Sequence, residues 1–176
     1  MSHDELTTPL LETRSYLMVR TLVGGMNVAS AVYGTVISLA VIGAWYADET
    51  SGALETLLSV LATLFVFWVA HAYAHVVGQG LPVGGSRLQI KHAFQHDWPI
   101  VQSGFLPMLI LGLGELGVMG ERVAMLMALG AGILLLSLFC LTMARAAGRN
   151  WQQALGITGA LVALGILVVV LEINLG

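Results

Sequence analysis

Four of the five histidines form two pairs, and the members of each pair lie four residues apart. The first pair is His71 and His75; the second is His92 and His96, which Asp97 follows directly. Residues four apart lie on one face of a helix, one turn from each other. Brought together, the two pairs would supply neutral nitrogen ligands for zinc or another borderline divalent ion, with Asp97 as a carboxylate ligand. A divalent metal site is therefore one hypothesis for the chemistry of this chain.

Two further interpretations of the histidines stay open. An H-x-x-x-H pattern occurs often by chance, and the intervening residues lack the general base of an H-E-x-x-H motif. The histidines could therefore contact only lipid headgroups or water, or they could sense or relay protons. His71 lies deepest in an apolar run, where an ionisable side chain is costly, and this position makes it the first candidate for transport or proton sensing.

The composition indicates a membrane protein. Apolar residues make up 57% of the chain and charged residues 10%, so a soluble domain of this size could not keep its apolar surface out of water. Apolar runs recur at about the 20-residue length that a bilayer core about 30 Å thick requires of a helix. The sequence therefore predicts an all-α, polytopic bundle of about five transmembrane helices in one domain, residues 1–176. The predicted spans are Thr21–Tyr46, Leu54–Val77, Pro99–Val118, Val123–Ala146 and Trp151–Ile173.

The basic residues predict the orientation of these spans. All but Arg122 lie in connections on one side, and acidic residues gather on the other. Lysine and arginine in short loops are retained in the cytoplasm. We therefore expect residues 1–20 and 79–98 to be cytoplasmic and the C-terminus to be external, in a bacterial plasma membrane. The basic residues on the cytoplasmic side would be Arg14, Arg20, Arg87, Lys91, Arg145 and Arg149.

The connection at 79–98 has two parts. A glycine-rich stretch comes first, and the pattern from Ser86 onward predicts a short amphipathic helix on the inner leaflet. Asp97 is followed by a tryptophan and a proline, an order typical of a helix start, so its carboxylate is expected to cap the third span. Pro107 lies within that span and frees the carbonyl four residues earlier, which predicts a kink.

Small residues predict close helix contacts in the first and last spans. Pairs of small residues four apart let helix backbones approach closely in a membrane, either within a chain or between protomers. A pore lining is the alternative for the first span, where one strongly polar amide shares the stripe of small residues. The residues are Asn27, Gly34 and Ser38 in the first span, and Gly156 and Gly159 in the last.

Two stretches of the chain carry a recognisable pattern. They are Phe67-Trp68-Val69-Ala70-His71-Ala72-Tyr73-Ala74-His75 and His96-Asp97-Trp98-Pro99-Ile100-Val101. The shorter stretch Tyr33-Gly34-Thr35 also fits this pattern. Over nearly the whole chain, the sequence resembles a group of small integral membrane proteins common in actinobacteria, whose pattern has glutamate at the position of Asp97. The resemblance implies a membrane fold and points to His71, Tyr73 and the turn that begins at His96. It implies no activity.

These features favour an oligomeric channel or small transporter with a histidine-lined inner mouth, formed by the second span and the following surface helix. For such a path, Tyr73, Asn27 and Glu115 join His71 and His75 as candidates, although Glu115 also fits a plain marker of the outer interface. The alternatives are an accessory subunit of a larger membrane complex and a metal-binding membrane module. The expected partners are the lipid bilayer and further copies of the chain or a larger complex. The net charge of −3 argues against a nucleic-acid partner, and no nucleotide or nucleophile motif is present, so an enzyme is the less favoured class.

Overall fold

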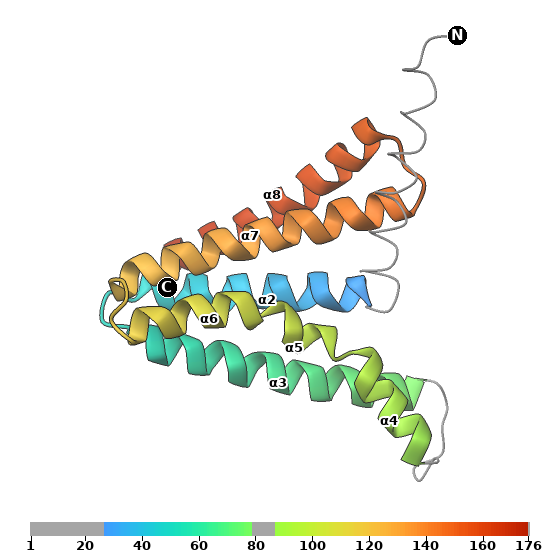
Figure 1. Cartoon of the computed structure of the whole chain (residues 1–176), viewed down its shortest axis with the longest axis horizontal. Helices are drawn as coiled ribbons and strands as arrows, with labels where there is room; N and C mark the ends of the chain where they lie inside the picture. Colours follow the sequence, from blue (N-terminus) through green and yellow to red (C-terminus); the bar gives the residue numbers. More distant parts are fainter. Residues whose placement is uncertain (1–26, 79–86, 176) are drawn as a thin grey trace, which may run out of the picture.

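The computed structural model describes residues 27–78 and 87–175, and this part of the chain is helical apart from short connections (Figure 1). The helices are α2 (Val28–Ala47), α3 (Ala53–Gly78), α4 (Arg87–His96), α5 (Pro99–Ser103), α6 (Phe105–Glu115), α7 (Glu121–Ala146) and α8 (Trp151–Leu175). The predicted all-α fold is confirmed. The predicted cytoplasmic segment 1–20 and the glycine-rich start of the 79–98 connection lie outside the described residues.

Four of these helices are long and apolar enough to cross a membrane. They are α2, α3, α7 and the Trp151–Leu171 part of α8. Their length and composition are those of a protein embedded in a bilayer. The structure differs from the prediction for the third span. The single helix that was expected is divided at Gly104 into α5 and α6, and α6 ends at Glu115 and not at Val118.

The break between α5 and α6 has a local cause. Pro107 has no N–H to donate to the carbonyl of Ser103, and its ring crowds the preceding turn. The N–H of Gly104 bonds to the carbonyl of Val101 at 3.2 Å, and regular helical bonding resumes when Met108 donates to the carbonyl of Gly104 at 2.9 Å. The interruption predicted from Pro107 is present, and it divides the span into two helices.

Helix α2 lies at the centre of the bundle and contacts α3, α5, α7 and α8. Leu39 of α2 is fully buried and packs where α7 and α8 carry glycines. A Cβ at Gly132 would lie 2.8 Å from Leu39, so this glycine makes room for the leucine, and Gly165 does the same for Leu136, which would lie 2.8 Å from its Cβ. The surrounding core is apolar and includes Ile42, Val60, Leu64, Ile100, Leu111, Met125 and Leu136.

The contact between α2 and α5 brings the two backbones together. A Cβ at Gly34 would collide with the backbone carbonyl of Ile100 and with the hydroxyl of Ser103. At the C-terminal end of α5, a Cβ at Gly104 would collide with the side chain of Leu64 in α3 and would lie 3.2 Å from the hydroxyl of Ser38 in α2. Helix α5 is therefore held tightly between α2 and α3, and the turn from α4 into α5 is placed beside the same two helices.

The two stripes of small residues are placed differently. In α2, Ser38 is buried and its hydroxyl donates to the carbonyl of Gly34 at 2.9 Å, so this stripe lies at helix contacts within the chain. In α8, Gly156 and Gly159 are exposed, and a Cβ at either position would meet nothing within 4 Å. Contact between protomers through the α8 stripe stays a prediction.

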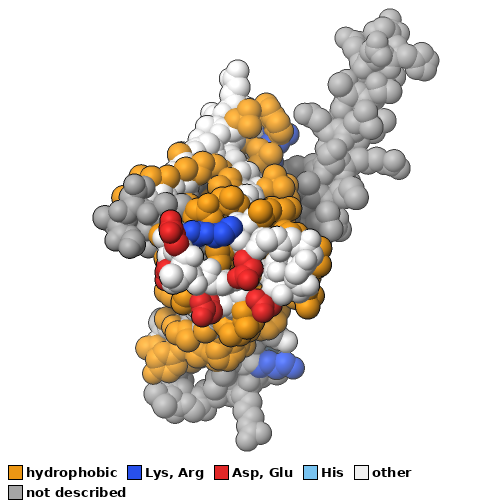
Figure 2. All heavy atoms as spheres, turned by 90° about the vertical axis from the view of Figure 1, so that its left-hand side faces the viewer, with side chains coloured by type: hydrophobic (Ala, Val, Ile, Leu, Met, Phe, Trp, Pro, Cys, Tyr) orange, Lys and Arg blue, Asp and Glu red, His pale blue; other side chains and the backbone are white. Residues whose placement is uncertain are grey.

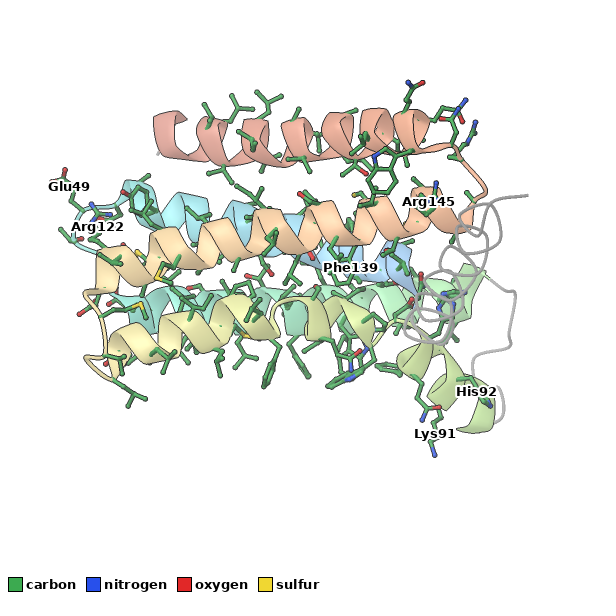
Figure 3. All side chains as sticks on the ribbon, turned by 45° about the horizontal axis from the view of Figure 1, so that its top comes forward. Glu49, Lys91, His92, Arg122, Phe139 and Arg145 are labelled. Carbon is green, nitrogen blue, oxygen red and sulfur yellow. The ribbon has the colours of Figure 1, made fainter. Side chains whose placement is uncertain are left out.

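Charged side chains separate to the two ends of the bundle. We call one end the histidine end, because it holds the start of α2, the end of α3 and helix α4; the α7–α8 turn also lies there (Figure 1). The other end, at the α2–α3 and α6–α7 turns, is called the acidic end, and Lys91 and Arg145 lie far from its Glu49 and Arg122 (Figure 3). At the acidic end, carboxylates gather on one face with a single basic side chain among them (Figure 2). The exposed carboxylates there are Asp48, Glu49, Glu55, Glu115 and Glu121.

Candidate metal centre

A buried carboxylate lies at the centre of the histidine end. The side chain of Asp97 is 1% exposed, and one of its oxygens lies 3.3 Å from Nδ1 of His75. The other oxygen lies 3.1 Å from Nδ1 of His96 and accepts a hydrogen bond from the hydroxyl of Ser30 at 3.2 Å. His75 comes from α3, His96 from the last residue of α4 and Ser30 from the first turn of α2. Three helices therefore converge on one carboxylate.

The prediction that Asp97 caps the third span is wrong. The residue before α5 is Trp98, and no side chain caps that helix. The first amides of α5 already have backbone partners, since Ile100 donates to the carbonyl of Asp97 at 3.0 Å and Val101 to the carbonyl of Trp98 at 3.0 Å. Pro99 has no N–H at all. The carboxylate of Asp97 is therefore free to bond to side chains of α2, α3 and α4.

Asn27 lies beside His96 and competes with Asp97 for the same ring nitrogen. Its amide caps α2, because Oδ1 accepts the N–H of Ser30 at 3.3 Å, and this bond fixes which way the amide faces. The Nδ2 atom of Asn27 then lies 3.3 Å from Nδ1 of His96. A neutral imidazole nitrogen either donates or accepts, so His96 bonds to Asp97 in one tautomer and to Asn27 in the other.

The structure leaves the other predicted residues outside this cluster. His71 is exposed on α3, one turn away, and its ring packs against Tyr33 with the ring centroids 5.8 Å apart. Tyr73 is 67% exposed. His92 is exposed on α4, which leaves the bundle at an angle so that only its C-terminal end reaches Asp97 (Figure 3). Glu115 lies at the acidic end.

Sequence reasoning missed Ser30. Its position three residues after Asn27 is the only local signal, and that signal indicates a helix start and not a contact with Asp97, which lies 67 residues away in the sequence. The contact depends on the close approach of α2 to α5 at Gly34, which the small-residue stripe predicts only in general terms.

The cluster fits the dimensions of a metal site. One ligand atom from each of His75, His96 and Asp97 can be chosen so that all three lie within 4.8 Å of one another. Ligands bound tetrahedrally at about 2.0–2.1 Å stand about 3.3 Å apart. The contacts of 3.3 Å and 3.1 Å from Asp97 to the two imidazoles, which involve different carboxylate oxygens, are each close to that spacing, and the ligand atoms of the full set span no more than 4.8 Å. Two imidazoles with one carboxylate form a set that binds borderline divalent metals and leaves coordination positions open.

The cluster is also reachable from its surroundings. The side chain of His75 is 34% exposed and that of His96 is 53% exposed, whereas Asp97 is buried behind them. An ion could therefore enter from the side of the imidazoles and meet the carboxylate last.

Comparisons with known proteins give no family for the chain. No family model, no curated protein and no solved structure matches it. The resemblance to the actinobacterial group stays a prediction, and the functional argument for this membrane protein depends on the geometry of its own residues.

Proposed function

We propose that this membrane protein binds a divalent transition-metal ion of the zinc class at its histidine end, through His75, His96 and Asp97. The observation that carries the proposal is the buried carboxylate of Asp97 in contact with both imidazoles. A buried charge is costly unless it is paired or binds a metal. Imidazole ligands favour zinc, cobalt, nickel, copper or iron over magnesium and calcium, which prefer oxygen ligands alone.

The number of ligands supports an exchangeable ion. Structural zinc sites have four protein ligands, whereas sites with three keep a position for water or another ligand. Here three residues supply ligands and two of them are partly exposed. The site therefore suits capture, sensing or hand-over of an ion at the membrane surface. The positive-inside pattern supports placing this surface in the cytoplasm.

A conduit through a single chain has less support. The largest fully buried side chains of the described residues are mostly aliphatic. Two of the buried hydroxyls bond within their own helices, since Thr35 donates to the carbonyl of Ala31 at 2.8 Å and Ser103 to that of Ile100 at 2.8 Å. A channel or small transporter would thus need a path between protomers, with the metal site at its mouth.

An oligomer or an accessory subunit is the second candidate. It is favoured by the open face of α8, where a Cβ at Gly156 or Gly159 would meet nothing within 4 Å in the part of the chain that the structure describes. A helix from another protomer or from a larger membrane complex could approach closely there. Assembly with other protomers or subunits is compatible with a metal site. It is tested by a different measurement, the size of the particle.

Equilibrium dialysis against zinc, with the protein in nanodiscs, tests the metal proposal. The wild type should retain about one zinc ion per chain. Replacing His75 or His96 with alanine should weaken zinc binding by about 100-fold or more, since loss of a ligand exceeds the 10- to 100-fold cost of losing a residue that only supports a ligand. Each has a matched control one helical turn away, because His71→Ala and His92→Ala remove the same side chain outside the cluster.

The controls make the result decisive. Both control variants should bind zinc within about twofold of the wild type, because neither residue belongs to the cluster. Equal losses in all four variants would show that the histidines bind zinc nonspecifically at the surface. A wild type that retains no zinc, cobalt or nickel would overturn the proposal and leave the accessory-subunit candidate.

A further inference from the structure

We infer that Trp68 is a positioning residue for the metal centre, acting by holding the C-terminal end of α4 against α3. The inference rests on the proposed metal site and identifies a residue that does not touch the metal. Trp68 lies on α3, two turns before His75, and its indole N–H donates to the backbone carbonyl of Phe94 at 3.0 Å. Phe94 precedes His96 by two residues in α4.

The bonded carbonyl is one that the helix itself leaves without a partner. The last four carbonyls of an α-helix have no amide partner further along the helix. In α4 the N–H of Asp97 reaches back to the carbonyl of Ala93 at 3.3 Å. The next carbonyl, that of Phe94, is bonded by Trp68 from the neighbouring helix. Trp68 therefore supplies the partner for one carbonyl in the last turn of α4, the turn that ends in His96.

Aromatic contacts reinforce this hydrogen bond on both sides of the ligands. The ring of Trp68 lies edge-on to that of Phe94 with the centroids 5.2 Å apart, and edge-on to that of Trp98 with the centroids 5.1 Å apart. Phe94 precedes His96 and Asp97 in the chain, and Trp98 follows them. Edge-to-face pairs at this separation are favourable beyond the burial of the rings. Trp68 thus contacts the chain two residues before His96 and directly after Asp97, on both sides of two of the three proposed ligands.

Helix α4 depends on these contacts because it packs against α3 and leaves the rest of the bundle (Figure 1). Among the residues that the structure describes, its other polar attachments to the bundle involve His96 itself, through Asn27 and Asp97. Before a metal binds, the indole N–H is therefore the hydrogen bond that fixes α4 to α3 without using a proposed ligand. Loss of this bond would let His96 and Asp97 move relative to His75.

The test compares Trp68→Phe with Trp98→Phe. Each variant removes an indole N–H and keeps an aromatic ring, but only the indole of Trp68 bonds to α4. Cobalt titrations of the full chain in nanodiscs should show affinity about 3- to 10-fold weaker in Trp68→Phe, as expected for loss of one hydrogen bond that organises the site. Its visible spectrum at saturation should shift toward a more hydrated ion. Trp98→Phe should stay within about twofold of the wild type with an unchanged spectrum.

A second readout does not depend on metal. Amide hydrogen exchange in the last turn of α4 should be faster in metal-free Trp68→Phe than in Trp98→Phe. Wild-type exchange in Trp68→Phe, or equal effects in the two variants, would overturn the inference. A lower melting temperature with unchanged affinity and spectrum would also overturn it, because Trp68 would then serve the general stability of the fold. Failure of the wild type to bind cobalt or zinc would reject the metal site itself, and hydrogen exchange would still decide whether Trp68 holds α4.

Discussion

The two ends of the bundle satisfy their carboxylates in different ways. At the acidic end, Glu121 accepts the backbone N–H of Ala53 at 2.9 Å, and Asp48 accepts that of Thr50 at 2.9 Å. The basic side chain at this end also bonds to the backbone, since the guanidinium of Arg122 donates to the carbonyl of Tyr46. At the histidine end, the carboxylate of Asp97 bonds to side chains of the described residues, and two of these are imidazoles. A backbone N–H cannot bind a cation, whereas a neutral imidazole nitrogen can, so the partners distinguish an end that closes turns from an end that could bind a metal.

Burial separates the two ends as well. Glu121 and the other carboxylates of the acidic end are exposed, so water stabilises their charge. Asp97 is buried, and its charge needs compensation from hydrogen bonds or a cation. The acidic end is therefore charged at little cost, whereas the histidine end holds a costly charge in a place where a cation would be stabilised.

The largest contrast expected between the ends is their accessibility in cells. A cysteine at Gly176 should react with an impermeant maleimide in intact cells, and one at Ser86 should not, because the histidine end is predicted to be cytoplasmic. Both belong in a Cys140→Ala background, since Cys140 is a free thiol. The reverse labelling would overturn the orientation, and labelling of neither position would indicate an even number of spans.

The next contrast compares one carboxylate from each end. Each is replaced by the amide of the same shape, which removes its negative charge. Asp97→Asn should weaken zinc binding by about 100-fold or more, because the ion loses its one anionic ligand. Glu121→Gln should leave zinc affinity unchanged, because the new carbonyl can still accept the N–H of Ala53. Zinc competition titrations of both variants measure the difference. Equal affinities would show that the ends do not differ in the way proposed.

Two glycines allow each end to be disturbed by packing alone. Gly34 packs against α5 near the histidine end, and a Cβ at Gly114, near the acidic end, would collide with Ala124 of α7. Alanine at either position should cost about 1–3 kcal/mol of stability through overpacking. Only Gly34→Ala should also weaken zinc binding, because it displaces the helix that follows Asp97. Thermal unfolding and zinc titration of both variants give the two readouts, and an equal effect on zinc would contradict this prediction.

A smaller effect on the fold is expected at the open face of α8. Gly159→Leu should leave the melting temperature and zinc affinity close to those of the wild type, because a Cβ at this position meets no atom of the described residues within 4 Å. It should reduce the size of the particle in mild detergent if protomers meet there. Light scattering measures this size. An unchanged size would show that this face of α8 contacts lipid.

The smallest effect concerns the acidic end alone. The pKa of the Asp48 carboxyl lies below its usual value of 3.8, because the backbone N–H and the hydroxyl of Thr50 donate to the carboxylate. A lowered pKa in the folded state means that the stabilisation is present above pH 3.8 and is lost as the pH falls through the folded-state pKa. Asp48→Asn should thus be slightly less stable than the wild type at pH 6, and this difference should disappear below pH 3.8. Thermal unfolding at both pH values tests it, and a difference that grows on acidification would contradict the sign.

The sequence predicted the helices well and the cluster only in part. The long apolar runs fix α2, α3, α7 and α8, because bilayer thickness sets helix length regardless of packing. The proline also predicted the break in the third span. Helix spacing, however, shows which residues share a face and not which helix that face meets. Helix spacing therefore could not show that His75 and not His71, and His96 and not His92, lies in the cluster around Asp97.

Asp97 shows most clearly what local patterns leave out. Its neighbours in the sequence are those of a helix start, and a capping role followed from them. Two of the three side chains that bind it, those of Ser30 and His75, come from helices distant in the sequence, and their convergence on Asp97 depends on the contact of α5 with α2 and α3. Tertiary packing decided the role of this residue, and no short motif around it carries that information.

X-ray absorption at the zinc edge tests the central claim most directly. The zinc-loaded wild type should show two imidazole nitrogens and one or two oxygens at about 2.0–2.1 Å. In Asp97→Asn the bound fraction should fall sharply, and in His71→Ala the spectrum should be that of the wild type. A first shell of oxygen atoms without imidazole, or a wild-type spectrum in Asp97→Asn, would contradict a metal centre built from His75, His96 and Asp97.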